Sequence, residues 1–387
     1  MKVAMITELI RPGGGPGGYL YNLREGMHNT GLSSDKIDFL SFSESSQRTA
    51  FVGGSGSTSI SKRFLKRMLF DAPSAVNHRK WMERITPKAL AEQVCQYDHV
   101  ILHGQTTYFL ATKLQKAGIP FSVMLHSPTV LADEGMMGAS RLRKSTSLYY
   151  AWLRHIDRFL LKKSRFVFSP SEDAMERYYE KFPDLNIQTK TLYVRSGAPE
   201  PEIRSAREEV RQSLGFSKNE LVVFYGGRFV EDKGFDLFLK VANMLSAKHE
   251  TFRFVCAGTG PMESSIPPTV TNLGWRSDIH DLVNAVDLVV IPNRSTYFDL
   301  LPLEVAAVGR AIVSTATGGN RQLKALLPDL FLAERPDEEA LVRAVERAAR
   351  HVELNGVHSS ANIQAYKVHF TTAEMARSWC GRIENIK

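Results

Sequence analysis

Two cations follow a glycine turn in the middle of the chain. The apolar run 221–225 ends at a Gly-Gly pair whose second member is Gly227, Arg228 comes next, and Lys233 stands five residues further on. A planar guanidinium can bind two anionic oxygens at once, and an ammonium adds a point charge. The combination predicts a phosphate or diphosphate site. The alternative is a solvated Arg and Lys that pair with the acidic residues 231–232.

Three more apolar runs of strand length lie in the same half of the chain. They are residues 252–257, 286–291 and 311–315, and they end at Gly258 and Gly260, at Pro292, and at Gly318. Helix-period segments separate them. Strands without polar alternation are typical of a parallel sheet that is buried on both faces, and such sheets bind ligands at the carboxyl ends of their strands. The conspicuous Gly, Arg and Lys residues all stand at such ends.

A second glycine loop follows the first strand of the chain. Gly13, Gly15 and Gly18 formally match GxGxxG, with Gly17 inside the match. The loop is several residues longer than the dinucleotide fingerprint, and Asp38 lies within an apolar run rather than at its end, so a dinucleotide site is not favoured. A flexible turn is one alternative. The other is a loop that presents backbone N–H groups at a helix start to a phosphate or a sugar hydroxyl.

Two histidines occupy strand ends in the N-terminal half. His103 follows the apolar run 99–102, and His126 follows the run 121–125. A lone His at such a place is most often an ordinary loop residue with a satisfied hydrogen bond. His126 is the stronger functional candidate, for a reason that comes with the family resemblance below.

Composition and length limit the class of protein. The chain has 387 residues, 43% of them hydrophobic and 23% charged, which fits a globular protein of two domains. Its three cysteines are far apart, so disulfides and a zinc site are not expected. The N-terminus does not read as a signal peptide and no apolar stretch is long enough to span a bilayer, so we expect a cytoplasmic protein.

The positive charge is concentrated in two segments. The chain carries a net charge of +8, and residues 60–88 hold eight Lys or Arg against two acidic residues, while residues 141–165 hold eight against one. Both segments interleave cations with apolar side chains at helical spacing. We expect peripheral docking on an anionic membrane surface, the inner face of the membrane. Core packing with a solvated basic face is the alternative, and nucleic-acid binding is not expected, because no known module is present.

Taken together, these motifs resemble the retaining glycosyltransferases of family 4 (glycosyl transferases group 1), which have the GT-B fold. The resemblance covers nearly the whole chain apart from residues 42–90. It rests on the order and spacing of several motifs, which include the glycine loop near Gly15 and His126 in the N-terminal half. Those in the C-terminal half are Gly226-Gly-Arg228, Lys233-Gly234, Gly258-Thr-Gly-Pro261, Leu273-Gly-Trp275, Glu304 and Gly318-Gly319.

The resemblance implies two Rossmann-like doubly wound α/β domains that face a central cleft. They would span residues 1–197, for the acceptor, and 198–364, for the nucleotide-sugar donor, with a C-terminal helix at 365–387 returning to the first. It also implies roles for individual residues. His126, Arg228 and Lys233 would be catalytic, the latter two holding the donor diphosphate, and Glu304 would accept the ribose hydroxyls. The remaining donor-binding positions would be Gly15, Gly17, Gly18, Gly227, Gly258, Gly260, Thr296, Phe298, Asp299, Leu300 and Leu301.

Two positions depart from the family pattern. The first of its paired glutamates, which grips donor-sugar hydroxyls, is Thr296 here, and the glycine after the aromatic residue is Asp299. A threonine hydroxyl can donate or accept a hydrogen bond but supplies no charge. Three explanations stay open: a donor sugar with fewer or differently placed hydroxyls, such as a deoxy sugar; substitution by Asp299; or loss of activity.

We therefore expect a hexosyl- or deoxyhexosyl-type glycosyltransferase of cell-surface polysaccharide or glycoconjugate biosynthesis. Its partners would be a nucleotide sugar and a glycan or lipid-linked acceptor, with UDP favoured over GDP as the nucleotide. No cofactor and no metal are expected, because Arg, Lys and helix N-termini can stabilise a leaving diphosphate without an ion. The alternative is a catalytically silent nucleotide-binding subunit that partners an active glycosyltransferase.

Overall fold

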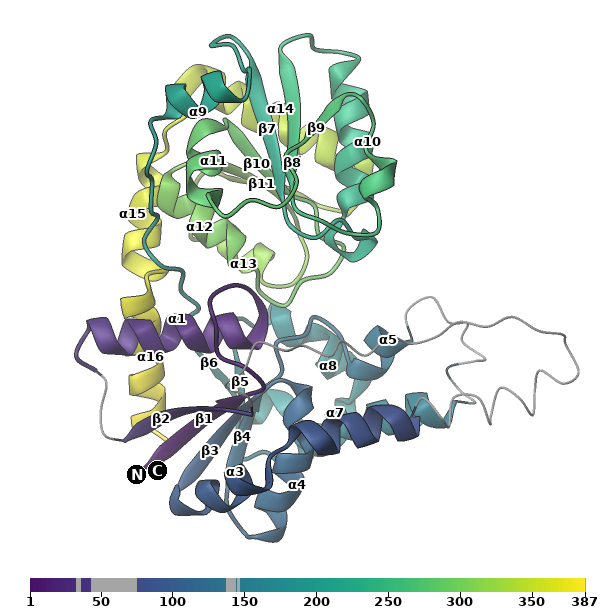
Figure 1. Cartoon of the computed structure of the whole chain (residues 1–387), viewed down its shortest axis with the longest axis vertical. Coiled ribbons are helices and arrows are strands. Elements are labelled where there is room, and N and C mark those ends of the chain that lie inside the picture. The colour runs from purple at the N-terminus through teal and green to yellow at the C-terminus, as the bar shows by residue number, and fades with distance from the viewer. Residues whose placement is uncertain (33–35, 43–74, 137–143, 145–146, 387) are drawn as a thin grey trace, which may run out of the picture. The chain divides into compact units, whose positions relative to one another are not determined.

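The computed structural model describes residues 1–32, 36–42, 75–136, 144 and 147–386, and divides the chain into two compact units. Unit 1 comprises Met1–Ser169, Met175–Val194 and Ala376–Lys387, and unit 2 comprises Pro170–Ala174 and Arg195–Met375. Each unit is an α/β layer structure around one parallel sheet, as expected (Figure 1). The sequence predicted the boundary between the two domains at residue 197, and the return of the C-terminal helix to the first domain from residue 365.

The sheet of unit 1 has six parallel strands in the order β2-β1-β3-β4-β5-β6. The order reverses between β1 and β3, and ligands of doubly wound sheets bind at the carboxyl ends of strands beside such a reversal. The elements of this unit are β1 (Val3–Thr7), α1 (Gly15–Asn29), β2 (Ile37–Ser41), α3 (Lys88–Gln93), β3 (His99–His103), α4 (Tyr108–Lys116), β4 (Phe121–Met124), α5 (Leu131–Gly135), α7 (Leu148–Lys163), β5 (Val167–Ser169), α8 (Glu176–Lys181), β6 (Thr191–Tyr193) and, from the end of the chain, α16 (Thr372–Glu384).

The sheet of unit 2 has the order β12-β11-β10-β7-β8-β9, which reverses between β7 and β10. Its strands are buried along most of their length because α10 and α14 cover one face and α11, α12 and α15 the other (Figure 1). The elements are α9 (Arg207–Ser213), β7 (Leu221–Gly226), α10 (Phe235–Ser246), β8 (Phe252–Ala257), β9 (Val270–Asn272), α11 (Ile279–Ala285), β10 (Leu288–Ile291), α12 (Leu301–Val308), β11 (Ala311–Thr315), α13 (Asn320–Lys324), β12 (Leu330–Ala333), α14 (Glu338–Asn355) and α15 (Ser360–His369).

The C-terminal helix α16 completes the core of unit 1. Trp379 is fully buried, its ring lies 4.6 Å from that of Phe168 on β5, and its indole N–H donates to the Tyr19 hydroxyl of α1 at 2.9 Å. A buried indole needs such a hydrogen-bond partner. The last helix therefore joins β5 and α1, which are separated by most of the sequence of the unit.

A buried polar network holds the loop that follows β4. The carboxylate of Asp157, fully buried on α7, accepts a hydrogen bond from the backbone of Leu131 at 2.6 Å. The hydroxyl of Tyr178 donates to the carbonyls of Ser127 and Thr129, at 3.2 and 2.8 Å. The second oxygen of Asp157 has no hydrogen-bond partner among the described residues, and burial raises the pKa of this carboxyl to about 8.

We expect Asp157 to make stability depend on pH. Its folded-state pKa lies above the unfolded value of about 3.9, so the folded state holds the extra proton between these values, and stability falls as pH rises from about 4 to about 8. Asp157→Asn keeps an acceptor for Leu131 and does not titrate. In urea unfolding followed by Trp fluorescence, the stability of this variant relative to wild type should increase by roughly 1–3 kcal/mol between pH 5 and pH 8.

The exposed carboxylate of Asp184 provides the control. A hydrogen bond from Arg158 lowers its pKa, so it is ionised in both states across this pH window, and Asp184→Asn should give a pH-independent difference. A pH-independent difference for Asp157→Asn as well would contradict the raised pKa of Asp157.

Candidate functional site

The candidate anion site of unit 2 lies at the carboxyl ends of β7 and β10, beside the reversal of strand order. Arg228 and Lys233 follow β7, and the segment from Asn293 to Leu301 follows β10. The fold therefore brings together, at one edge of the sheet, two groups of residues that are about sixty positions apart in the sequence. This is the place where the topology predicts a ligand.

Backbone contacts make the neighbouring loops one continuous surface. The N–H of Gly227 donates to Ala257 at 3.0 Å, and the N–H of Gly258 donates to Gly274 at 2.8 Å. Gly258 has φ +147°, and a Cβ there would lie 1.8 Å from the carbonyl oxygen of Gly227. A side chain at this position would push the loops apart. A Cβ on Gly260 would also be too close to its neighbour, at 2.5 Å from the carbonyl oxygen of Phe229.

The two predicted phosphate-binding cations differ in their surroundings. Arg228 is exposed, and among the described residues its guanidinium has no hydrogen-bond or ion-pair partner. Lys233 is half-buried, and its ammonium lies 2.9 Å from the Asp299 carboxylate. The acidic neighbours that would satisfy these cations as plain surface residues, Glu231 and Asp232, make no ion pair with either of them. Burial raises the pKa of Asp232.

Asp299 is the centre of this group. One carboxylate oxygen takes the ion pair with Lys233, and the other accepts a hydrogen bond from the side chain of the buried Asn293. Arg294 fixes the same loop to α10, because its guanidinium donates twice to Asp236, at 2.7 Å each. An anionic side chain thus occupies the position beside Lys233 that the sequence assigned to a diphosphate.

Glu304 lies in the first turn of α12, and its carboxylate makes no hydrogen bond or ion pair within the described residues. Burial raises its pKa. A half-buried acceptor without a partner can accept hydrogen bonds from ligand hydroxyls. Thr296 is only 5% exposed, and the half-buried residues Phe298, Leu300 and Leu301 lead into α12.

The glycine loop of unit 1 surrounds the start of α1. A Cβ on Gly17 would lie 2.1 Å from the carbonyl oxygen of Leu9, and one on Gly18 would lie 1.4 Å from that of Gly13. These two glycines are therefore required by close packing of the loop on the helix. Gly15 begins α1 and has open space around it.

His103 and His126 form a hydrogen-bonded pair at the carboxyl ends of β3 and β4. Nδ1 of His103 lies 2.9 Å from Nε2 of His126, and the ring of Tyr19 packs edge-on against His126 at 4.9 Å between centroids. Burial lowers the pKa of His126 to about 3 and that of His103 well below its usual value, so both rings are neutral. His126 has φ +61°, a conformation that costs a non-glycine residue about 1–3 kcal/mol.

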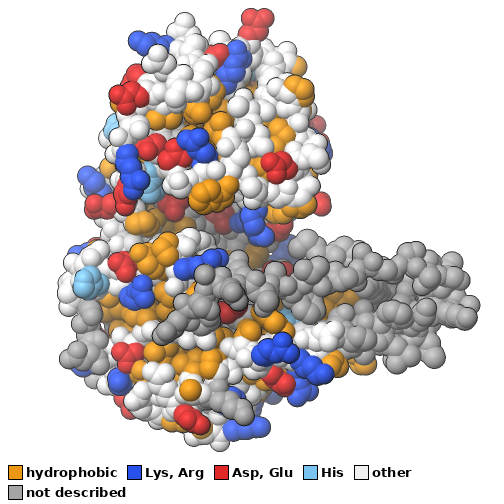
Figure 2. Space-filling model, viewed as in Figure 1, with side chains coloured by type: hydrophobic (Ala, Val, Ile, Leu, Met, Phe, Trp, Pro, Cys, Tyr) orange, Lys and Arg blue, Asp and Glu red, His pale blue; other side chains and the backbone are white. Residues whose placement is uncertain are grey.

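The two basic segments are described only in part, because residues 60–74, 141–143 and 145–146 lie outside the described ranges. Residues 75–85 form a helix whose His78 contacts α7, with Nδ1 2.8 Å from the Tyr149 hydroxyl and its ring 5.4 Å from that of Trp152. Aromatic side chains of the two segments thus pack on each other. Lys80, Arg84, Lys162 and Lys163 are exposed. On the face drawn in Figure 2, Lys and Arg side chains are interspersed with Asp and Glu.

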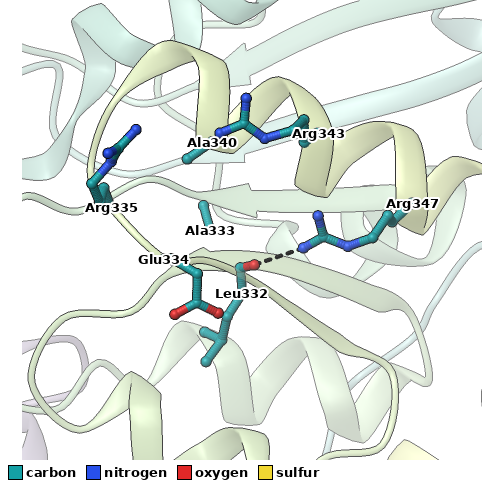
Figure 3. Close-up of a pocket in the computed structure, with 7 residues that line it drawn as sticks. All are labelled: Leu332, Ala333, Glu334, Arg335, Ala340, Arg343 and Arg347. Atoms are coloured by element: carbon teal, nitrogen blue, oxygen red, sulfur yellow. Dashed lines mark hydrogen bonds between the residues drawn. The ribbon is translucent and has the colours of Figure 1, made fainter.

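A surface depression of about 290 Å³ lies between the end of β12 and α14 (Figure 3). It contains none of the predicted site residues, and its arginines have partners: Arg347 donates to the carbonyl of Leu332, and Arg335 to Asp337, both at 2.8 Å. Within the described residues, no three His, Cys, Asp or Glu side chains are grouped as a metal site would require. None of the described helices is long and apolar enough to cross a membrane.

Sequence patterns alone did not identify several residues that contact the predicted site residues. Asn293 and Arg294 hold the loop that carries Asp299, and their only signal was their position directly after a buried strand. His103 was noticed at a strand end, but no pattern indicated that its side chain meets His126.

Comparisons with known proteins agree with this geometry. Residues 220–351 match the family model described as glycosyl transferases group 1. The 2-deoxystreptamine N-acetyl-D-glucosaminyltransferase of Streptomyces fradiae is 25% identical over 270 residues, covering 66% of this chain and 63% of that protein. The UDP-Gal:alpha-D-GlcNAc-diphosphoundecaprenol alpha-1,3-galactosyltransferase of Escherichia coli is 25% identical over 277 residues, covering 67% and 68%.

A solved structure matches the whole chain. HepE from Anabaena, solved in complex with UDP, superposes with a TM-score of 0.68 at 15% identity and covers 100% of both chains. The chain therefore has the GT-B fold of two Rossmann-like domains, as the sequence predicted. The chain spans about three fifths of the length of the first curated relatives it matches.

Proposed function

We propose that this protein is a retaining glycosyltransferase that moves a sugar from a nucleoside-diphosphate sugar to a glycan or lipid-linked acceptor in cell-surface polysaccharide or glycoconjugate biosynthesis. The observation that carries the proposal is the group at the ends of β7 and β10. There Lys233 lies with Arg228 and Glu304, whose charged groups have no partner among the described residues. All three lie within residues 220–351, which match the glycosyl transferases group 1 family model.

In this proposal the donor binds to unit 2 by its two polar ends. Arg228 and Lys233 take the diphosphate, and each charge-assisted hydrogen bond contributes about 1.5–3 kcal/mol. Glu304 accepts the ribose hydroxyls. We assign contacts with the phosphates and the sugar to the backbones of Gly227, Gly258 and Gly260 and to the segment 298–301, because these loops follow β7, β8 and β10 at the carboxyl edge of one sheet.

The leaving diphosphate needs no metal ion in this scheme. Two cations and the N-terminus of α12 provide fixed positive charge beside the developing anion. We infer that His126 and Gly15, both in unit 1, take part in sugar transfer. Transfer would retain the anomeric configuration by front-side attack, in which the leaving phosphate helps to take the acceptor proton.

The donor is inferred to be a UDP-linked hexose or deoxyhexose. UDP is favoured over GDP because the galactosyltransferase relative uses UDP-Gal and HepE was solved with UDP. At the sugar end, a buried Thr296 replaces a carboxylate, which suits a sugar with fewer hydroxyls at that contact.

Nucleotide-sugar hydrolysis tests the proposed activity directly. The purified chain is incubated with UDP-, GDP- and dTDP-hexoses, and release of free sugar is followed, because an active transferase transfers sugar slowly to water. Release of sugar with at least one donor is expected. Nucleotide binding without any release would favour the silent nucleotide-binding subunit instead.

Lys233→Ala should weaken binding of UDP by about tenfold or more, because one charge-assisted contact is lost. The measurement is isothermal titration calorimetry. Lys240→Ala provides the matched control, because Lys240 is an exposed lysine on α10 whose nearest ion-pair partner is Glu338 at 3.5 Å. Equal affinities for the Lys233 and Lys240 variants would show that Lys233 does not hold the diphosphate.

Asp299→Asn should strengthen binding of UDP several-fold. The substitution removes an anion that pairs with Lys233 and keeps a side chain of the same shape, and a half-exposed ion pair of this kind is worth up to about 1 kcal/mol. Calorimetry with UDP and with a non-hydrolysable UDP-sugar analogue separates the two roles of Asp299. Unchanged UDP binding with lost affinity for the UDP-sugar would mean that Asp299 binds the sugar in place of the missing glutamate.

We also propose peripheral binding to an anionic membrane, through residues 60–88 and 141–165, at the inner face of the cell membrane. The lipid-linked acceptor of the galactosyltransferase relative supports it, and each Lys or Arg near such a surface contributes roughly 1 kcal/mol. The protein should cosediment with phosphatidylglycerol vesicles at low salt, less at high salt, and not with neutral vesicles.

The exposed cations allow a matched test of that surface. Replacing Lys80, Arg84, Lys162 and Lys163 by Ser should reduce cosedimentation, whereas replacing Lys218, Lys248, Arg335 and Arg350 of unit 2 should not. If both quadruple variants bind vesicles as wild type does, the described parts of the basic segments are not the docking surface.

A further inference from the structure

A tyrosine hydroxyl in the core of unit 2 reaches the loop that carries Arg228. Tyr225 is the penultimate residue of β7 and is only 2% exposed, and its ring centroid lies 5.0 Å from that of Phe235 and 5.3 Å from that of Phe238. Its hydroxyl donates to the carbonyl of Arg228 at 2.7 Å. The ring of a tyrosine is apolar, but its buried O–H needs a hydrogen-bond partner. A phenylalanine would fill the same place in the core without that bond.

The carbonyl of Arg228 belongs to a peptide unit that is held at both ends. The N–H of the same unit, which is that of Phe229, donates to the carbonyl of Thr259 in the loop after β8, at 3.0 Å. The C=O and N–H of a trans peptide point in opposite directions, so the two hydrogen bonds together prevent this unit from rotating. The backbone on either side of the peptide, at Arg228 and Phe229, is thereby fixed.

The rest of the turn restrains this peptide only weakly. Among the described residues, the Arg228 carbonyl accepts one further hydrogen bond, from the N–H of Val230 at 3.0 Å. A bond between residues two positions apart moves with the loop and cannot anchor it to the core. Gly226 and Gly227 precede Arg228, and glycine restricts the backbone least. Within the described ranges, the hydroxyl of Tyr225 is therefore the group that ties this carbonyl to the core.

We propose that Tyr225 is a positioning residue of the donor site: its hydroxyl holds the Arg228–Phe229 peptide, so that the guanidinium of Arg228 meets the diphosphate from a fixed backbone. The inference rests on the proposed function, in which Arg228 takes the diphosphate. The guanidinium is exposed and has no partner within the described ranges, so no contact there orders its far end before a ligand binds. A fixed backbone lowers the free-energy cost of ordering this side chain on binding.

The binding test removes only the hydroxyl. Tyr225→Phe should weaken binding of UDP and of inorganic pyrophosphate equally, by roughly three- to tenfold, because the lost hydrogen bond acts at the diphosphate that both ligands share. Isothermal titration calorimetry on the full chain measures both affinities, at low salt to keep weak complexes measurable. The matched control is Tyr366→Phe, since Tyr366 is 3% exposed, lies on α15 of the same unit and donates to the carbonyl of Ala198 at 3.0 Å. This control should lose similar stability in urea and bind pyrophosphate as wild type does.

A double-mutant cycle separates positioning from a general loss of structure. If Tyr225 acts through Arg228, then Tyr225→Phe should change the affinity for pyrophosphate by less than about twofold once Arg228 is replaced by alanine, because no guanidinium remains to be positioned. Additive losses of affinity in the double variant would overturn the proposal. Wild-type affinity in Tyr225→Phe, or an equal loss in Tyr366→Phe, would overturn it as well.

Amide hydrogen exchange tests the same peptide without any ligand. In Tyr225→Phe the N–H of Phe229 should exchange at least about threefold faster than in wild type, because the peptide can rotate away from Thr259, and Tyr366→Phe should leave this rate unchanged. An unchanged rate in Tyr225→Phe would show that the hydroxyl does not hold the peptide. If the wild-type protein binds neither UDP nor pyrophosphate, the proposed function fails, while the exchange rates still decide whether Tyr225 fixes this backbone.

Discussion

A parallel sheet that is covered by helices on both faces leaves only its strand ends for polar chemistry. In both units the strands are buried along most of their length, so charged and polar side chains that must meet a ligand can project only from the loops at these ends. At the reversal of strand order, the loops after two adjacent strands run to opposite sides of the sheet and leave room for a ligand between them. Arg228, Lys233 and Asp299 lie beside the reversal in unit 2, and the glycine loop and His103 lie beside the one in unit 1.

In unit 2, partial burial of a cation that could bind an anionic ligand costs hydration free energy, and a neighbouring carboxylate partly offsets this cost. A half-buried ammonium loses hydration, and the Asp299 carboxylate compensates Lys233 when no phosphate is present. Arg228 has no such partner within the described ranges and is exposed to solvent. In the proposed function, Arg228 is therefore available for the first contact with a diphosphate, whereas Lys233 must exchange one anion for another. A glycine at position 299, as in the family pattern, would require no exchange.

The sequence predicted most of the strands, their burial in parallel sheets and the loops that follow them, because these depend on local patterns, but it did not predict β9 or β12. Apolar runs of strand length and the glycines at their ends define the elements within a residue or two. In the structure, close packing of the backbone explains why positions 18 and 258 are glycines, Gly18 and Gly258. From the sequence alone, this reason could not be distinguished from a role in ligand binding. The pairing of Lys233 with Asp299 was not predictable, since the two residues are 66 positions apart and their distance depends on two loop conformations. The same holds for the contact between residues 75–85 and α7, where aromatic side chains that suggested a membrane-facing surface pack on each other.

The two candidate sites differ in the kind of electrostatics that they use. In unit 2 the groups are ionised and at least partly exposed, so salt and competing anions should act on them directly. In unit 1 the histidine pair is buried and neutral, and burial keeps the pKa of both rings below the physiological range. A neutral imidazole in a buried position gains little from charge and acts through the geometry of its hydrogen bonds instead. This difference follows from the proposed division of labour, in which unit 2 binds a dianionic diphosphate and unit 1 must orient an uncharged sugar by the direction of single hydrogen bonds.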